Sequence, residues 1–271
     1  MISFLCPVCK KELVRVENSL KCPDGHCFDI SRKGIVNLLR SNRSHHGDDK
    51  RMVAARRAFL DKGYYKPLCG RISAFAAKYA GADCSLLDCG CGECYYTADI
   101  AAVLASKGIN ADIIGIDVSK DALNAGASRH TGARLAAASV FDIPLPDSSC
   151  DIIVSLFSPF SGDEYLRVLK GRGIYITAFP LAEHLFELKK AVYDEPYPNK
   201  VSPLDVEGFE LAEYEECAFD MELASNADII ALFEMTPYCY KTSAPDRAKL
   251  DIIDRLTVKA AFGTAVYRKL T

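Results

Sequence analysis

The stretch "LLDCGCGECYYTADIA", residues 86–101, decides the fold that we predict for this chain. Its apolar start is typical of a buried strand, and its end has the pattern of a helix. Between them, Gly90 and Gly92 can adopt backbone angles that other residues avoid, and they let the chain pass close to a ligand. In a doubly wound sheet, a ligand binds at the carboxyl end of such a strand, beside the helix N-terminus. We therefore expect a cofactor loop here.

The same loop contains Cys89, Cys91 and Cys94, so a metal site is the alternative interpretation. A metal site needs a fourth ligand and sulfur atoms that converge. Cys89 belongs to the end of the strand and Cys94 to the first turn of the helix, so we expect their sulfur atoms to point apart. A free cysteine is usually a small buried residue, which favours the cofactor loop.

The residues around the loop indicate which cofactor it holds. The third glycine of the dinucleotide fingerprint is absent from this loop. The pattern from Asp88 through Gly90 to Gly92 instead resembles the first motif of S-adenosylmethionine-dependent methyltransferases. Asp117 ends the next predicted strand, where an acidic residue accepts hydrogen bonds from the ribose hydroxyls. The alternative role for Asp117 is that of an acid at a helix N-terminus.

Short apolar runs alternate with helical patterns along most of the chain, which predicts an α/β fold. The expected architecture is a Rossmann-like S-adenosylmethionine-dependent methyltransferase domain with a small N-terminal zinc-binding module. We expect strands in residues 85–90, 111–119, 133–139, 150–157, 173–179 and 260–270, and helices in residues 95–108, 120–130 and 183–194.

The N-terminal segment carries the spacing of a metal site. Two residues lie between Cys6 and Cys9, which form the first pair. Cys22 and His26 form a second pair further along the chain. Three thiolates and one imidazole at this spacing predict a structural zinc with no open coordination position. Cys27 is the alternative fourth ligand, and it would point elsewhere on an extended chain.

Charge divides the chain unevenly. Residues 1–66 hold 14 Lys and Arg against 7 Asp and Glu, whereas the remainder holds 19 against 29. A basic N-terminal part on an acidic body suggests that a polyanion such as RNA binds there. The candidate RNA-binding residues are Arg32, Lys33, Arg40, Arg43, Lys50, Arg51, Arg56 and Arg57.

These observations divide the chain into two predicted domains. Residues 1–40 form a zinc-binding module for RNA recognition, residues 41–50 a polar linker, and residues 41–271 the methyltransferase domain including that linker. The start of the chain lacks the pattern of a signal peptide, and no run of 18 apolar residues is present, so we expect no membrane span. Twelve cysteines without a secretion signal are typical of reduced cytoplasmic thiols.

Together, the zinc module and the glycine loop resemble the RlmA family, the bacterial 23S ribosomal RNA (guanine-N1)-methyltransferases. Further matching stretches are "KGIVNLL", "GDDKRMVAARRAFLDKGYYKPL", "GIDVSK", "IPLPDSSCDII", "HLFELK" and "EMTPY". The stretch "LKGRGIYIT" departs from the family because it lacks the usual Lys-Pro-Gly-Gly turn.

The resemblance implies further contacts with S-adenosylmethionine. Tyr65 would approach the cofactor from before the sheet, Gly92 and Glu93 would lie along its methionine end, and His184 would close over it. Without the family, Tyr65 reads as a core aromatic residue, Glu93 as an acid at a helix N-terminus and His184 as an exposed residue at a helix start. The family also implies a 23S rRNA hairpin as substrate and a homodimer.

The base to be methylated is expected at the loop after the fourth strand, residues 157–165. Ser158, Pro159 and Phe160 could clasp it, with Phe160 stacking on the base; an ordinary proline turn is the alternative. The sequence singles out no general base and does not say which guanine of the hairpin is modified. Two other functions fit parts of the sequence: a small-molecule methyltransferase with a structural zinc module, and a non-catalytic zinc-bearing RNA-binding protein.

Overall fold

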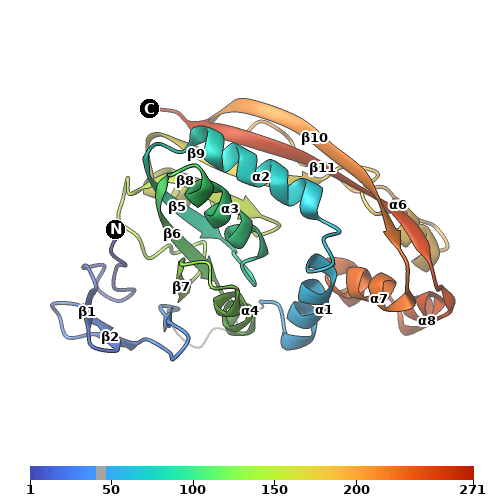
Figure 1. Cartoon of the computed structure of the whole chain (residues 1–271), viewed down its shortest axis with the longest axis horizontal. Helices are drawn as coiled ribbons and strands as arrows, with labels where there is room; N and C mark the ends of the chain where they lie inside the picture. The colour runs from blue at the N-terminus through green and yellow to red at the C-terminus, as the bar shows by residue number, and fades with distance from the viewer. Residues whose placement is uncertain (41–46) are drawn as a thin grey trace.

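The computed structural model of the protein describes residues 1–40 and 47–271. Its main body is an eight-stranded sheet with the strand order β10-β11-β9-β8-β5-β6-β7-β4 (Figure 1). The strands are β4 (Ile35–Asn37), β5 (Asp83–Cys89), β6 (Asn110–Asp117), β7 (Arg134–Ala137), β8 (Cys150–Leu156), β9 (Leu169–Pro180), β10 (Phe209–Leu223) and β11 (Leu256–Lys269).

The central strands run parallel and create a topological switch point. β5 pairs in parallel with β6 on one side and with β8 on the other, and the chain reverses its direction of travel across the sheet there. β11 pairs antiparallel with both β9 and β10. The predicted α/β class is confirmed, and the carboxyl end of β5 lies where such sheets bind ligands.

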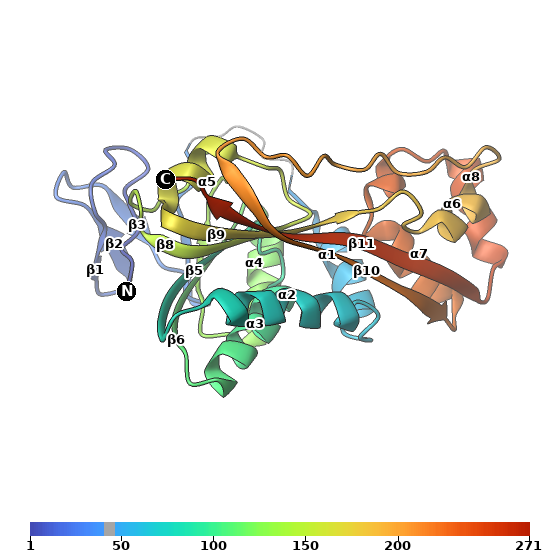
Figure 2. The ribbon, with the colours of Figure 1, turned by 90° about the horizontal axis from the view of Figure 1, so that it is seen from above.

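Helices cover both faces of this sheet. α2 and α3 lie together on one face, and α5 lies on the other (Figure 2). Side-chain caps help to define several helix starts; for example, the Asp49 carboxylate accepts a hydrogen bond from the backbone N–H of Met52. The helices are α1 (Lys50–Leu60), α2 (Lys66–Tyr79), α3 (Tyr95–Ser106), α4 (Lys120–Gly126), α5 (Gly162–Val168), α6 (Phe186–Val192), α7 (Asn226–Glu234) and α8 (Ala244–Ala248).

Two apolar cores fill the two faces. One packs α1, α2, α3, α6 and α7 against the sheet, and Leu86 of β5 belongs to it. The other lies on the opposite face, and Leu87 of β5 belongs to it because successive side chains of a strand point to opposite sides. Buried residues on both sides explain why β5 reads as a continuous apolar run.

The N-terminal module is joined to the large sheet. Its own sheet comprises β1 (Val14–Val16), β2 (Ser19–Lys21) and β3 (Cys27–Asp29). Phe4, Leu13 and Leu38 share the second core with the sheet. β4 lies within the predicted module of residues 1–40, yet it pairs with β7 as the last strand of the large sheet. The module therefore extends this sheet.

The C-terminal part is more regular than the sequence pattern indicates. β10 and β11 form a long antiparallel ribbon that ends beside α7 and α8 (Figure 1). β10, α7 and α8 are absent from the elements that we predict from sequence.

Most of the predicted linker, and with it Arg43, lies outside the described residues. None of the helices within the described ranges is long and apolar enough to cross a membrane.

Candidate cofactor and metal sites

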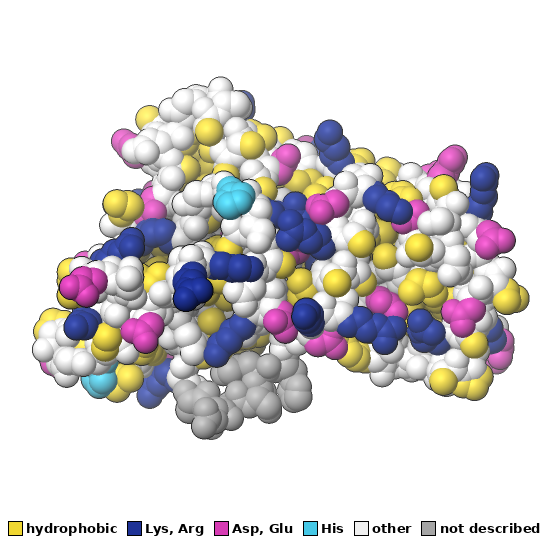
Figure 3. All heavy atoms as spheres, turned by 60° about the horizontal axis from the view of Figure 1, so that its bottom comes forward, with side chains coloured by type: hydrophobic (Ala, Val, Ile, Leu, Met, Phe, Trp, Pro, Cys, Tyr) yellow, Lys and Arg dark blue, Asp and Glu magenta, His cyan; other side chains and the backbone are white. Residues whose placement is uncertain are grey.

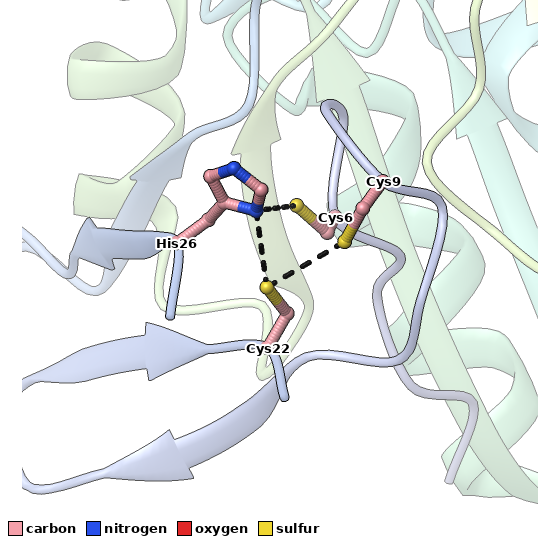
Figure 4. Close-up of side chains that lie close together, drawn as sticks. All are labelled: Cys6, Cys9, Cys22 and His26. Atoms are coloured by element: carbon pink, nitrogen blue, oxygen red, sulfur yellow. Dashed lines mark hydrogen bonds between the residues drawn. The ribbon is translucent and has the colours of Figure 1, made fainter. Parts of the chain in front are cut away.

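Four side chains converge in the zinc module (Figure 4). The Nδ1 atom of His26 lies 3.3 Å from the Sγ of Cys22 and 3.6 Å from the Sγ of Cys6, and the sulfur atoms of Cys9 and Cys22 are 3.6 Å apart. A tetrahedral zinc with ordinary bond lengths separates such ligand atoms by about 3.5–3.8 Å. The donor set therefore fits a structural Zn²⁺ bound by three thiolates and one imidazole.

Two tight turns bring the ligands together. In the first, the N–H of Lys10 donates to the carbonyl of Cys6 (2.8 Å) and Lys10 has a φ of 60°. In the second, Gly25 has a φ of 84° and its N–H donates to the carbonyl of Cys22 (3.0 Å). Cys27 is exposed on β3 and does not belong to the cluster, which favours His26 as the fourth ligand.

The glycine loop follows β5 as predicted, with left-handed backbone angles. Gly90 and Gly92 have φ values of 78° and 54°. A Cβ atom on Gly90 would overlap Ser158, so this position also requires the absence of a side chain. Cys94 precedes α3 with a φ of 61°, which explains why glycine is favoured at this position.

The three cysteines of the loop do not form a common cluster. Cys89 packs in the core that contains the zinc module, whereas Cys91 and Cys94 pack with Leu123 of α4 in a separate small core. The loop therefore places its cysteines as buried apolar residues.

Asp117 lies at the carboxyl end of β6, beside the loop. Its Oδ2 accepts the N–H of Gly92 at 2.9 Å, and its Oδ1 accepts the N–H of Ser119 at 2.8 Å. Burial raises the pKa of Asp117 while both backbone donors oppose this shift. Each carboxylate oxygen retains a second lone pair, so the group can still accept ribose hydroxyls.

Asp88 is buried beneath the loop. Its Oδ2 accepts a hydrogen bond of 2.6 Å from the hydroxyl of Thr97 on α3. Burial raises the pKa of Asp88 to about 7. This bond ties the end of β5 to the first turns of α3, and so it fixes the loop from below.

The carboxylate of Glu93 is buried and is bound by other side chains of the protein. Its side chain is 2% exposed, and Arg129 binds it with Oε1 at 2.6 Å and Oε2 at 2.8 Å from one guanidinium nitrogen. The Nε of Arg57 lies 3.9 Å from the same carboxylate. Glu93 therefore borders the loop through its backbone, while its side chain anchors α1 and the segment after α4.

Tyr65 and His184 approach the same place from distant parts of the sequence. Tyr65 precedes α2 and His184 precedes α6, and both rings contact Phe262 of β11, at centroid distances of 5.2 Å and 4.4 Å. The Nδ1 of His184 accepts the N–H of Ala261 at 3.1 Å, and burial lowers the pKa of His184 to about 3. His184 is thus a neutral ring, buried where sequence alone suggested an exposed residue.

The loop after β8 is held firmly under the glycine loop. The hydroxyl of Ser158 donates to the carbonyl of Cys89 (2.9 Å) and bonds the hydroxyl of Ser155 (2.7 Å). Phe160 is 47% exposed and rests on Tyr165 and Tyr175. Ser158 therefore supports the loop, and Pro159 lies between it and Phe160 as an exposed residue.

Two of the candidate RNA-binding arginines turn toward the cofactor loop. Arg56 pairs with Asp48 and lies near Gly92, and Arg57 donates to the carbonyl of Ala125 at 3.0 Å. Arg51 pairs with Glu234 while remaining largely exposed. Other members of the candidate set are exposed on the zinc module or at the start of α1: Arg32, Lys33, Arg40 and Lys50.

Several residues at the site have no signal in the sequence. Thr97 binds the carboxylate of Asp88, and Arg129 binds the carboxylate of Glu93. Arg129 lies 36 residues from Glu93 in the sequence. Ser119 donates its hydroxyl to the carbonyl of Asp48 at 2.6 Å, which brings the segment before α1 against the Asp117 turn. For Thr97 alone, the helical pattern of α3 offers an indication, because it places residue 97 on the buried face in the first turns of that helix.

Comparisons with known proteins agree with both sites. Residues 4–45 match the family model "RlmA, N-terminal", a zinc ribbon, and residues 86–173 match the model "Methyltransferase domain". The 23S rRNA (guanine(748)-N(1))-methyltransferase of Streptomyces fradiae is 36% identical over 191 residues, which cover 69% of this chain and 66% of that protein.

Two further proteins extend the comparison. A predicted 23S rRNA (guanine-N(1)-)-methyltransferase of Micromonospora griseorubida is 31% identical over 98% of this chain and 97% of that protein. Among solved structures, a predicted methyltransferase from Bacillus halodurans C-125 has a TM-score of 0.50 and 16% identity, covering 75% of this chain and 99% of that chain. The structural likeness supports the fold, and the sequence likeness extends across both sites.

Proposed function

This chain belongs to the RlmA family of 23S rRNA (guanine-N1)-methyltransferases, and on that premise we propose that it methylates N1 of a guanine in a 23S rRNA hairpin. The observation that carries the proposal is one chain with two complete sites. The module that holds the zinc cluster also contributes β4 to the large sheet. The central strand of that sheet, β5, carries the cofactor loop. A non-catalytic RNA-binding protein does not need the cofactor loop, and the relatives named as 23S rRNA methyltransferases favour RNA over a small-molecule substrate.

The chain's residues would hold the cofactor and align the base. S-adenosylmethionine supplies a methyl group on a positively charged sulfur. Bound there, it would supply the methyl carbon to guanine N1 with its sulfur as the leaving group, and the N1 proton would pass to solvent or to a nearby acceptor. Positioning supplies most of the rate in such a displacement. Asp117 would bind the ribose, the backbone of Gly92 and Glu93 the methionine end, and Tyr65 and His184 would enclose it.

The zinc module and the charged surface support RNA as the substrate. Lys and Arg side chains extend across the face in Figure 3 from the end with the zinc module to the opposite end, with acidic side chains between them. A hairpin offers a dense phosphate backbone for such residues and unpaired bases for a pocket. We infer that Arg32, Lys33, Arg40 and Lys50 contact phosphates, because they lie on or next to the module and are exposed.

The family resemblance also supports a homodimer that works in the cytoplasm, where ribosomal RNA is available. Two zinc modules could then flank one RNA. Pairing through the free edge of β10 is unfavourable, because that strand carries six acidic residues and no Lys or Arg. A dimer would therefore use another surface.

Methyl transfer to purified 23S rRNA tests the function. RNA from a deletion strain is incubated with the protein and radiolabelled S-adenosylmethionine, and modified sites are mapped by primer extension. We expect label in the RNA and one new stop, because a methyl group on N1 blocks base pairing. Label that appears only in small molecules would favour the small-molecule methyltransferase. RNA binding with neither methyl transfer nor cofactor binding would favour the non-catalytic RNA-binding protein.

A further inference from the structure

The loop after β8 holds an exposed aromatic side chain in a strained conformation. Phe157 has a φ of 59°, and its side chain is 53% exposed. A left-handed conformation is sterically unfavourable for a residue with a Cβ atom, and much of the aromatic ring remains exposed to solvent. Hydrogen bonds maintain this arrangement, since the hydroxyl of Tyr165 donates to Ser155 (2.9 Å), which in turn bonds Ser158 (2.7 Å). Strain that is maintained in this way is typical of functional sites.

The rings of Phe157 and Phe160 lie against opposite faces of the sheet. Phe160 rests on Tyr165 and Tyr175, which belong to the core shared with the zinc module. Phe157 lies 5.7 Å from Phe262 and 6.4 Å from Tyr96 between ring centroids. Phe262 is the ring that both Tyr65 and His184 contact, so Phe157 faces the side on which those two residues lie.

A second observation indicates that this side holds a ligand. The hydroxyl of Tyr96 is buried and has no hydrogen-bond partner among the described residues. A buried hydroxyl without a partner is unfavourable, because it has lost its hydrogen bonds to water. Tyr96 lies in the first turn of α3, directly after the cofactor loop, and its ring neighbours that of Phe157. A ligand that enters beside these two rings can supply the missing partner.

We propose that Phe157, rather than Phe160, is the platform on which the target guanine stacks. The inference rests on the proposed function, because it assigns the contact surface for the base that the enzyme methylates. The ring is fixed in space, exposed to a partner, and adjacent to the residues that enclose the methyl donor. Every nucleobase has a planar π-face, and a base that stacks on an aromatic side chain gains affinity without needing a sequence-specific contact.

Matched variants of the two phenylalanines test this assignment. Phe157→Leu removes the flat ring and keeps an apolar side chain, Phe157→Tyr keeps the ring, and Phe160→Leu alters the other exposed ring of the loop. For each, kcat and KM are measured with 23S rRNA, cofactor affinity by calorimetry and folding by thermal unfolding. We expect Phe157→Leu to lower kcat/KM by about five- to hundredfold, with cofactor Kd within twofold of wild type. Phe157→Tyr should stay within threefold, and Phe160→Leu should change activity much less than Phe157→Leu.

A direct measurement of stacking complements the kinetics. The chain contains no Trp, so a hairpin with 2-aminopurine in place of the target guanine gives a clean fluorescence signal. Wild type and Phe157→Tyr should quench it, and Phe157→Leu should not. Equal activity and quenching in Phe157→Leu and wild type would overturn the inference while leaving the proposed function intact. If wild type transfers no methyl group to 23S rRNA but quenches through Phe157, the proposed function fails and the binding surface stands.

Discussion

At the scale of single residues, Asp117 is the side chain that we propose to hold the ribose. The sequence placed an acid at the end of the second strand of the domain, and the structure adds that two backbone N–H groups already orient its carboxylate. Those bonds fix the direction of the oxygen lone pairs before a ligand binds. The same bonds give Asp117 a structural role in the turn, so its two roles must be separated by experiment.

Asp117→Ala should weaken S-adenosylmethionine binding. Loss of hydrogen bonds to a charged acceptor costs about 1.5–3 kcal/mol, which corresponds to about 10- to 150-fold in Kd. Calorimetry measures this change, and Asp121→Ala, an exposed acid in the first turn of α4, is the matched control. Unchanged affinity in Asp117→Ala would mean that Asp117 only shapes the turn and that other groups hold the ribose.

Cys94 and Gly126 are a coupled pair. A Cβ atom on Gly126 would lie 2.7 Å from the Sγ of Cys94, so Gly126→Ala should destabilise the protein by about 1–3 kcal/mol. In a Cys94→Gly background, the same change should cost less, because the sulfur is gone and alanine is the better helix former. The backbone carbonyl carbon of Glu93, 3.1 Å from the added Cβ, keeps part of the cost. Urea unfolding of all four proteins measures the coupling.

The control for this cycle is Gly70→Ala. Gly70 lies within α2, and a Cβ atom there would meet nothing within 4 Å. This substitution should stabilise the helix by up to about 1 kcal/mol. An equal cost of Gly126→Ala in the wild-type and Cys94→Gly backgrounds would contradict the packing argument.

At the scale of elements, the zinc ligands determine more than their own turns. The two turns hold the short strands of the module, and residues Phe4, Leu13 and Leu38 carry its apolar core onto the main sheet. The N–H of Leu5 donates to the carbonyl of Pro144 at 2.9 Å, and β4 completes the sheet beside β7. A module of this size cannot form a core alone, so metal binding and sheet packing stabilise it together.

Cys22→Ala should therefore lose the zinc and also lower the free energy of unfolding of the whole chain. Metal analysis should find one zinc per wild-type chain, and denaturant unfolding should show the loss of stability. Cys27→Ala is the control, because Cys27 is exposed and outside the cluster, and it should keep both properties. Full zinc retention in Cys22→Ala and in His26→Ala would rule out this ligand set.

At the scale of the whole molecule, the position of each basic residue decides what it can bind. Arg56 and Arg57 were candidates for RNA from their place in a basic stretch, yet their guanidinium groups face Asp48 and Glu93 beside the cofactor loop. Their replacement should therefore disturb the cofactor site. Exposed basic residues on the zinc module are the better test of RNA binding.

The double variant Arg32→Ala with Arg40→Ala should weaken 23S rRNA binding and reduce its salt dependence. Each lost phosphate contact should lower the slope of log K against log salt by about 0.7–0.9. Cofactor affinity should remain the same, because phosphate contacts position the RNA only. Filter binding over a salt series measures the first two effects, and calorimetry the third.

The matched control is Lys200→Ala with Arg255→Ala, two exposed basic residues outside the zinc module. It removes the same charge and should have a smaller effect on affinity. Equal losses in both double variants would indicate that net charge, and not the zinc module, governs RNA binding.

The sequence by itself determined the features that depend on local spacing. The spacing of Cys6 and Cys9, followed by that of Cys22 and His26, predicts a zinc site, with Cys27 as the alternative fourth ligand. The strand, glycines and helix of residues 86–101 define the cofactor loop, because only glycine tolerates both the backbone angles and the close approach of Ser158. Alternating apolar segments then predict a parallel sheet.

Only the tertiary structure decided which residues meet across long separations. It made β4 a strand of the large sheet, paired Glu93 with Arg129, and gathered Tyr65, His184 and Phe157 around Phe262. It also turned Phe157 and Phe160 to opposite faces, although three positions separate them. Such contacts arise from packing among distant segments, and the local pattern of a sequence does not encode which distant segments will pack together.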